Sequence, residues 1–272
     1  MTLSGKLCAL LLAAAVGSVV AKPADQPHHR IRIEGHGKPT VVLEAGLGDT
    51  LEVWKSIQPE IAAGCARTVA YSRAGYEGSD PAVGPRDAAT IVDELRAELR
   101  RRNLLPPYVL VGHSLGGLYM QYFARNYPTE VTGLVLIDST HWNQGLRLDK
   151  AADVPYSGRR SVTLFMPWIM RRELGDSARA GEEVHESPPP GEVPTIVLSS
   201  TRQLEGETPE TQADAGRMQD EIAATFPNSR HLLVPDSGHY IQRDQPEAVV
   251  RAVRKLAGCE TSPPGAQSPG IP

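Results

Sequence analysis

The chain has 272 residues, of which 40% are apolar, so it can build one large domain around a sizeable core. It carries 28 Lys and Arg against 32 Asp and Glu, a net charge of -4 that leaves no basic surplus for nucleic-acid phosphates. No Cys/His cluster has the spacing of metal ligands. We therefore expect no nucleic-acid partner, no metal and no organic cofactor.

Residues 1–21 have the pattern of an export signal peptide. Lys6 precedes an uncharged stretch that runs from Leu7 to Ala21 and ends on the small residues that a signal peptidase prefers. A retained membrane anchor is the alternative, but the stretch is short for a bilayer-spanning helix of about 20 residues. We predict a mature chain that begins at Lys22, is secreted or periplasmic, and has no stable membrane insertion after cleavage.

After the leader, strand-like apolar runs alternate with helical patterns. Strands are expected at 40–44, 68–71, 108–111, 131–137, 195–198 and 231–235. Helices are expected at 50–63, 87–102, 116–124 and 246–257. This order predicts an α/β fold, with a mostly parallel central sheet and helices on both faces. We assign 22–138 and 195–258 to this core, and 259–272, rich in Pro, Gly and Ser, to a flexible tail.

Cys65 and Cys259 are the two cysteines that remain after export. Each follows the end of a predicted helix, and the two helix ends lie together if both helices cover the same face of the sheet. Export makes a disulfide permissible, so we predict a Cys65–Cys259 bond. Two buried thiols are the alternative.

The peptide Gly112-His113-Ser114-Leu115-Gly116 lies between a predicted strand and a predicted helix. Small residues two positions before and after Ser114 let the backbone close a tight turn, which lifts the hydroxyl clear of both elements. We therefore expect Ser114 to be a nucleophile.

Residues 139–194 form a connection far longer than the ~2–6 residues of an ordinary loop in such folds. We predict a cap insertion over the serine, with a surface excursion around its own minor core as the alternative. Phe165, Met166 and Trp168 within it suggest an apolar substrate, or else form the core of the cap.

A serine hydroxyl needs a neighbouring base at neutral pH, and His239 follows a late strand in a short loop before the last helix. His113 lies inside the turn and is expected to point away from the serine, whereas His141 could line the pocket. Four other histidines are expected to be solvated surface residues: His28, His29, His36 and His185.

Four stretches, 43–48, 72–76, 112–117 and 237–239, occur in the order found in the α/β-hydrolase fold superfamily, and the chain resembles its small bacterial serine hydrolases over roughly residues 30–258. One departure is Ala45-Gly46, where many members have His-Gly. The resemblance implies an oxyanion hole formed by the backbone N–H groups of Leu47 and Leu115. In the alternative interpretation, Gly46 and Gly48 beside Leu47 are turn residues with no electrostatic role.

The acid that orients the base is expected to be Asp138, since some members of the superfamily carry an acid at the end of this strand. Glu205 or Glu207, after the next strand, are the alternatives. Asp138 would otherwise be a buried residue that holds the loops together.

These residues together predict an exported serine hydrolase, an esterase that forms an acyl-enzyme intermediate on a small-molecule ester or acyl substrate. A serine rather than an aspartate at the turn argues against epoxide hydrolases and dehalogenases. A lipase, an amidase or aminopeptidase, an acyltransferase, and a binding protein that lacks catalysis are the alternatives.

Overall fold

The computed structural model describes residues 26–63, 65–151, 165–203 and 208–259. Their strands form a seven-stranded sheet in the order β1-β3-β2-β4-β5-β6-β7, in which β1 pairs antiparallel with β3 and the other pairs are parallel. The mostly parallel sheet is therefore confirmed. The strands are β1 Arg30–Glu34, β2 Thr40–Glu44, β3 Arg67–Ser72, β4 Tyr108–His113, β5 Val131–Ile137, β6 Thr195–Ser200 and β7 Ser229–Val234.

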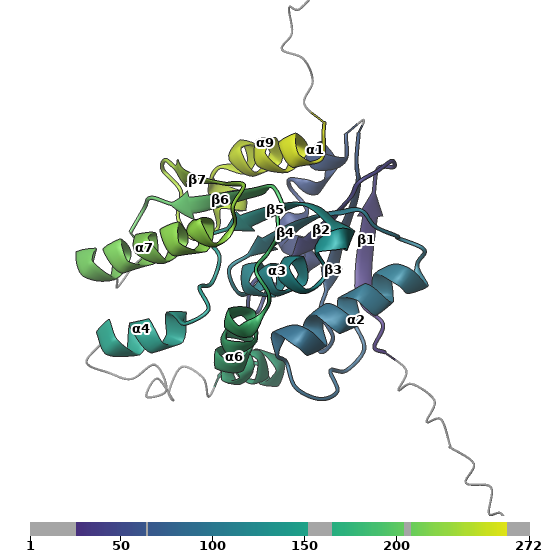
Figure 1. Ribbon diagram of the computed structural model, residues 1–272. Helices are drawn as coiled ribbons and strands as arrows, with labels where there is room; N and C mark the ends of the chain where they lie inside the picture. Colours follow the sequence, from purple (N-terminus) through teal and green to yellow (C-terminus); the bar gives the residue numbers. More distant parts are fainter. Residues whose placement is uncertain (1–25, 64, 152–164, 204–207, 260–272) are drawn as a thin grey trace, which may run out of the picture.

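Helices cover both faces of this sheet (Figure 1). The α-helices are α1 Gln58–Ala62, α2 Ala88–Arg101, α3 Leu115–Asn126, α4 Gln144–Ala151, α6 Trp168–Glu186, α7 Pro209–Thr225, α8 Ile241–Asp244 and α9 Pro246–Leu256. Two short 3-10 helices are η1 Leu51–Trp54 and η2 Pro128–Glu130.

Successive strand residues point to opposite faces, so each buried strand contributes to two cores. On one face Val42 and Leu110 join the cluster that contains residues of α2, α3 and α7. On the other face Val41, Val109 and Val135 join the cluster that contains residues of α1 and α9. Because both faces are buried, the strands read as continuous apolar runs in the sequence.

The prediction of one continuous helix at 50–63 is wrong. The structure has η1 followed by a separate helix α1, which begins at Gln58. Pro59 lies in the first turn of α1, where its missing N–H has no cost, whereas in the interior of a longer helix it would remove a hydrogen bond. The Thr50 side chain accepts from the Glu52 N–H and begins η1 instead.

Several expectations fall on parts of the chain outside the described residues: the signal peptide at 1–21, Glu205 and Glu207, and the tail beyond Cys259. Of the insertion at 139–194, α4 and α6 are described and 152–164 are not. Among the helices that are described, none is long and apolar enough to cross a membrane.

The predicted disulfide is present, with the Cα atoms of Cys65 and Cys259 5.7 Å apart. Residues of α1 and α9 share one core, so the two helices cover the same face as expected. Arg254 near the end of α9 also donates to the carbonyl oxygens of Glu60 and Ala63, at 3.2 and 2.9 Å. The alternative of two buried thiols is therefore wrong.

The Cys65–Cys259 bond closes a loop of 194 residues, so its loss enlarges the conformational freedom of the unfolded chain. We expect the double variant Cys65→Ser/Cys259→Ser to lose about 2–5 kcal/mol of unfolding free energy. Urea denaturation with and without dithiothreitol measures this loss. The reductant should destabilise the wild type and leave the double variant unchanged; equal midpoints for the wild type in both conditions would contradict the prediction.

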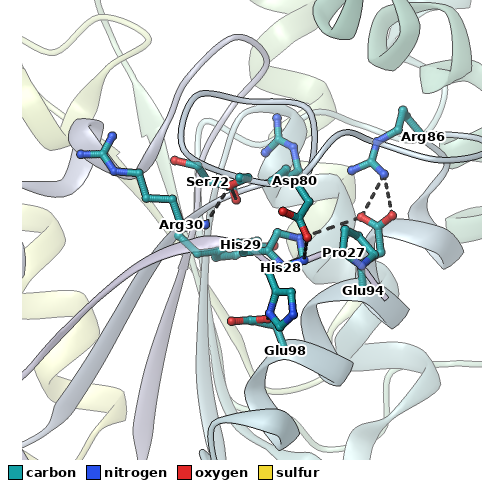
Figure 2. Close-up of polar contacts among 12 residues, drawn as sticks. Pro27, His28, His29, Arg30, Ser72, Asp80, Arg86, Glu94 and Glu98 are labelled. Atoms are coloured by element: carbon teal, nitrogen blue, oxygen red, sulfur yellow. Dashed lines mark hydrogen bonds and ion pairs between the residues drawn. The ribbon is translucent and has the colours of Figure 1, made fainter. Parts of the chain in front are cut away.

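His29 is buried, with 4% of its surface exposed, so its expected place in solvent is wrong. The segment before β1 lies against the loop that follows β3, where the His28 N–H donates to Asp80 Oδ2 at 2.8 Å (Figure 2). The His29 ring meets Tyr71 edge to face and lies 3.9 Å from Glu94, which Arg86 holds at 2.8 Å. Burial lowers the pKa of His29 to about 4. His28, His36 and His185 are exposed as expected.

Because the pKa of His29 falls from 6.5 in the unfolded chain to about 4 in the folded one, acid protonates the unfolded chain first. His29 therefore contributes stability above pH 6.5 that is lost as the pH falls toward 4, up to about 3 kcal/mol. We expect the unfolding free energy of His29→Gln to fall less between pH 7 and 4 than that of the wild type. His36→Gln, at an exposed site, is the matched control and should keep the wild-type slope. Equal slopes in all three proteins would refute this role of His29.

Candidate active site

Ser114 occupies the turn between β4 and α3 with a φ of 52° and a ψ of -124°. A positive φ is strained for a residue with a Cβ atom and persists only where its surroundings hold it. Here the Ser114 N–H donates to the Ile137 carbonyl at 3.0 Å, and its own carbonyl accepts from Gly117 and Thr140 at 2.9 and 3.0 Å. Two neighbouring segments therefore fix this conformation.

The glycines of the turn are required by close backbone contacts. A Cβ atom on Gly112 would lie 2.6 Å from the Cα atom of Gly117. A Cβ atom on Gly116 would lie 2.4 Å from the carbonyl oxygen of Ala45, in the loop after β2. Gly112 thus allows the tight turn that the sequence pattern predicts. Gly116 also lets the loop after β2 pack directly against the turn.

Asp138 and His239 form a hydrogen-bonded pair at the carboxyl ends of β5 and β7. The His239 Nδ1 atom lies 2.7 Å from Asp138 Oδ2, so an Nδ1–H donates to the carboxylate. Asp138 Oδ1 accepts from the N–H and the hydroxyl of Ser200, both at 3.2 Å. With Nδ1 protonated, the Nε2 atom of a neutral His239 is free to accept a proton.

Ser114, Asp138 and His239 line one cavity of about 310 Å³. Most of the other lining side chains are polar. The polar ones are Ser139, Gln144, Ser199, Ser200, Arg202, Gln212 and Gln219. The others are Ala215, Gly216, Met218 and Leu233. Gln144 comes from α4, so the 139–194 insertion supplies part of this wall.

Phe165 and Trp168, two aromatic residues in the described part of the insertion, are not among the residues that line this cavity. Phe165 is 88% exposed and Trp168 is 50% exposed. The expectation that these two residues form the core of the insertion is therefore wrong, whereas the apolar substrate stays a prediction. Neighbouring Ile169 is buried instead, and it packs against Gly75 after β3.

The two backbone groups expected to bind an oxyanion belong to segments that adjoin Ser114. Leu115 is the first residue of α3, where the helix dipole favours negative charge. Leu47 follows Gly46, whose Cβ position would lie 3.2 Å from the Cβ atom of Ser114. Among the hydrogen bonds of the described chain, neither N–H group has a protein acceptor.

His113 packs beneath the site, as expected. Its Nε2–H donates to the His239 carbonyl at 2.9 Å, and its ring lies 4.7 Å from the His239 ring and 4.8 Å from the Tyr240 ring. Burial, together with the nearby His239, lowers the pKa of His113 to about 3. A neutral His113 therefore supports the backbone of the residue that bonds Asp138.

His141 does not line the cavity of Ser114. It lines a neighbouring cavity of about 220 Å³, together with Arg125 and Trp142. Its Nδ1 atom lies 2.7 Å from the Asn143 side chain.

Across the described residues, no three His, Cys, Asp or Glu side chains converge as metal ligands would.

A second Ser-His-Asp set, which the sequence patterns did not indicate, lies beside the cavity. Ser199 Oγ is 2.6 Å from His231 Nε2, and His231 Nδ1 is 2.7 Å from Asp220 Oδ1. Ser199 is in the regular strand β6 and is 2% exposed, whereas Ser114 is half-buried on a turn. The second set therefore lacks a turn that presents its serine, and it makes Ser199 a matched control for Ser114.

No sequence pattern indicated Glu173, a buried acid of α6. It bonds Arg73, which lies 100 residues earlier, at 2.7 Å. No local pattern predicts such a pair, because the two side chains meet only when the insertion packs against the sheet.

The comparisons with known proteins agree with this architecture. The profile of the alpha/beta hydrolase fold family matches residues 39–187, more than half of the chain. The uncharacterized protein YqjL of Bacillus subtilis is 26% identical over 242 residues, 87% of this chain and 91% of that protein.

Two solved structures share the fold at low sequence identity. A thermophilic esterase from Thermogutta terrifontis has a TM-score of 0.58 at 21% identity, covering 84% of this chain and 94% of that one. An enol-lactonase from Burkholderia xenovorans has a TM-score of 0.59 at 19% identity, covering 84% and 95%. The family match over residues 39–187, together with the sheet order, shows that the chain belongs to the alpha/beta hydrolase fold family.

Proposed function

We propose that this protein is a serine hydrolase that cleaves carboxylic esters through an acyl-enzyme intermediate. One observation carries the proposal: Ser114, on its strained turn, shares a cavity with the hydrogen-bonded pair of Asp138 and His239. A nucleophile, a base and an orienting acid are the three groups that acyl transfer by a serine requires.

In the first half of the reaction, Ser114 Oγ attacks the ester carbonyl carbon and its proton passes to His239 Nε2. The Asp138 carboxylate stabilises the imidazolium that results. The Leu47 and Leu115 N–H groups bind the negative oxygen of the tetrahedral intermediate, and each such donor is typically worth about 2.7–4 kcal/mol. The intermediate then collapses, and the leaving alkoxide takes the proton from His239.

In the second half, a water molecule replaces the alcohol. His239 Nε2 accepts a proton from this water as the water oxygen attacks the acyl carbon of the ester to Ser114. Collapse of the second tetrahedral intermediate returns that proton to Ser114 Oγ and releases the carboxylic acid. Ser114 and His239 are then back in their starting forms, and the proposed steps use no cofactor.

We assign the orienting role to Asp138 because its carboxylate is already engaged on both sides. One oxygen bonds His239, and the other accepts two hydrogen bonds from Ser200. These hydrogen bonds fix the orientation of the carboxylate toward the His239 ring.

The cavity supports a small, polar substrate. Its volume of about 310 Å³ lies near the lower end of ligand pockets, and seven of its fourteen lining residues have amide or hydroxyl side chains. We therefore propose short esters with polar substituents rather than long apolar acyl chains. The likeness to proteins named an esterase and an enol-lactonase supports hydrolysis of an ester bond, since a lactone is a cyclic ester.

We also propose that the protein works outside the cytoplasm. Disulfides such as Cys65–Cys259 persist in oxidising compartments, and the leader pattern of residues 1–21 predicts the same route. The mass of protein recovered from its host tests this placement, and an N-terminus still at Met1 would contradict it.

Hydrolysis of p-nitrophenyl esters from acetate to palmitate tests the proposed reaction. We expect the wild type to prefer the short esters, and Ser114→Ala to reduce kcat by about 10⁴-fold or more because the nucleophile is gone. Ser199→Ala, which removes a serine of the same cavity that also bonds a histidine, should keep kcat within about threefold of the wild type.

The same assay identifies the acid. Asp138→Asn should lower kcat by about 10³–10⁴-fold, whereas Glu205→Gln and Glu207→Gln should leave it unchanged. A large loss in a glutamate variant with an active Asp138→Asn would reverse this assignment. A palmitate optimum would indicate a lipase, and equal negligible rates for the wild type and Ser114→Ala would overturn the esterase proposal.

A further inference from the structure

Arg73 holds the loop that carries Leu47. It follows β3, is 2% exposed, and donates from Nη1 to the Ala45 carbonyl at 2.6 Å and from Nη2 to the Gly46 carbonyl at 2.9 Å. Nη1 also donates to Glu44 at the end of β2, at 2.6 Å. One guanidinium therefore binds the carbonyl of the peptide group that contains the Leu47 N–H, and also the carbonyl of the peptide group before it.

Tyr76 holds the same loop from the other side. Its hydroxyl accepts from the Gly48 N–H at 3.0 Å, one residue after Leu47. Two side chains of a single loop after β3 thus fix backbone groups immediately before and after Leu47. A peptide N–H held on both sides is pre-organised, as an oxyanion donor must be.

Glu173 of α6 joins these two side chains. Its Oε1 atom accepts from Arg73 Nε, and its Oε2 atom accepts from Arg73 Nη2 and from the Tyr76 hydroxyl, all at 2.7 Å. Glu173 is fully buried. Met170, one turn earlier on α6, packs against Gly48, so the helix contacts the loop directly as well.

The charges of this cluster make Glu173 the decisive partner. Burial lowers the pKa of Arg73, but Glu173, Tyr76 and Glu44 together raise it well above its ordinary value, so the guanidinium stays charged. Burial raises the pKa of Glu44 to about 7 against the opposing effect of Arg73, and Glu44 accepts one hydrogen bond from Arg73 where Glu173 accepts two. A buried cation that loses a bidentate carboxylate partner must reorganise or draw in water.

We propose that Glu173 is a positioning residue, which through Arg73 and Tyr76 holds the Leu47 N–H where it stabilises the oxyanion. This inference rests on the proposed ester hydrolysis. It assigns to helix α6 of the insertion a part in the rate of the reaction, although Glu173 touches neither the substrate nor the reacting atoms.

Steady-state kinetics of Glu173→Gln on the preferred short ester test the inference. We expect kcat to fall by about 10–100-fold, part of the 10²–10³-fold loss on removing a whole oxyanion donor, with KM changed less than threefold. A trifluoromethyl ketone of matched chain length forms a tetrahedral adduct on the serine. Its inhibition constant should rise in proportion to the fall in kcat, a correlation that a general loss of stability does not produce.

Glu94→Gln is the matched control. Glu94 is another buried acid paired with a buried arginine, Arg86, at 2.8 Å, but it bonds no group of the loop at 45–48. The Glu94→Gln substitution should lower the midpoint of unfolding and leave kcat and inhibitor binding unchanged. Tyr76→Phe removes the hydroxyl from Glu173 and Gly48 without leaving an unpaired charge, so it tests the same loop if Glu173→Gln does not fold.

The outcomes separate this inference from the proposed function. If the wild type hydrolyses the ester and Ser114→Ala does not, the esterase proposal holds whatever the Glu173 variants do. Wild-type kcat and inhibitor affinity in folded Glu173→Gln or Tyr76→Phe would then overturn the positioning role. Equal losses in Glu94→Gln would overturn it too, because they would indicate a general loosening of the buried charges.

Discussion

The backbone conformation of Ser114 is the constraint on which the rest of this site depends. A positive φ at a serine has a steric cost, and neighbouring elements hold the residue in this conformation. Ser114 directly follows β4, its N–H donates to the Ile137 carbonyl of β5, and Gly116 packs against Ala45 in the loop after β2. The glycine spacing is therefore a requirement of packing between neighbouring strands as well as of one tight turn. It brings the carboxyl ends of β2, β4 and β5 together at the edge where the cavity lies.

Two polar clusters lie near this turn, and they differ in how far their charged groups are buried. The pair of Asp138 and His239 is half-buried and borders the cavity, so its proton can exchange with a substrate. The cluster around Arg73 is buried, and carboxylate and carbonyl oxygens of the protein accept hydrogen bonds from all three guanidinium nitrogens. The first arrangement suits proton transfer, and the second suits a rigid scaffold for the loop that carries Leu47.

Two attachments join parts of the described chain that lie far apart in the sequence. The segment that carries His239 runs into α8 and α9, and the Cys65–Cys259 bond joins the segment after α9 to the segment after α1. At the β1 edge of the sheet, the burial of His29 beside Glu94 holds the segment that leads into β1.

Apolar runs, glycine spacing and helix signals act over a few residues, and for this reason most strands, the Ser114 turn and the Asp87 start of α2 were predictable from the sequence. The Cys65–Cys259 bond was predictable too, because it needs only the direction of two helices on one face. The resemblance also led to Asp138 as the acid beside His239, with Glu205 and Glu207 as alternatives. Other features join residues that are distant in the chain: the pairing of Glu173 with Arg73, and the polar residues of the cavity wall. No local pattern encodes such contacts, because the distance between two such side chains depends on how all the intervening elements pack.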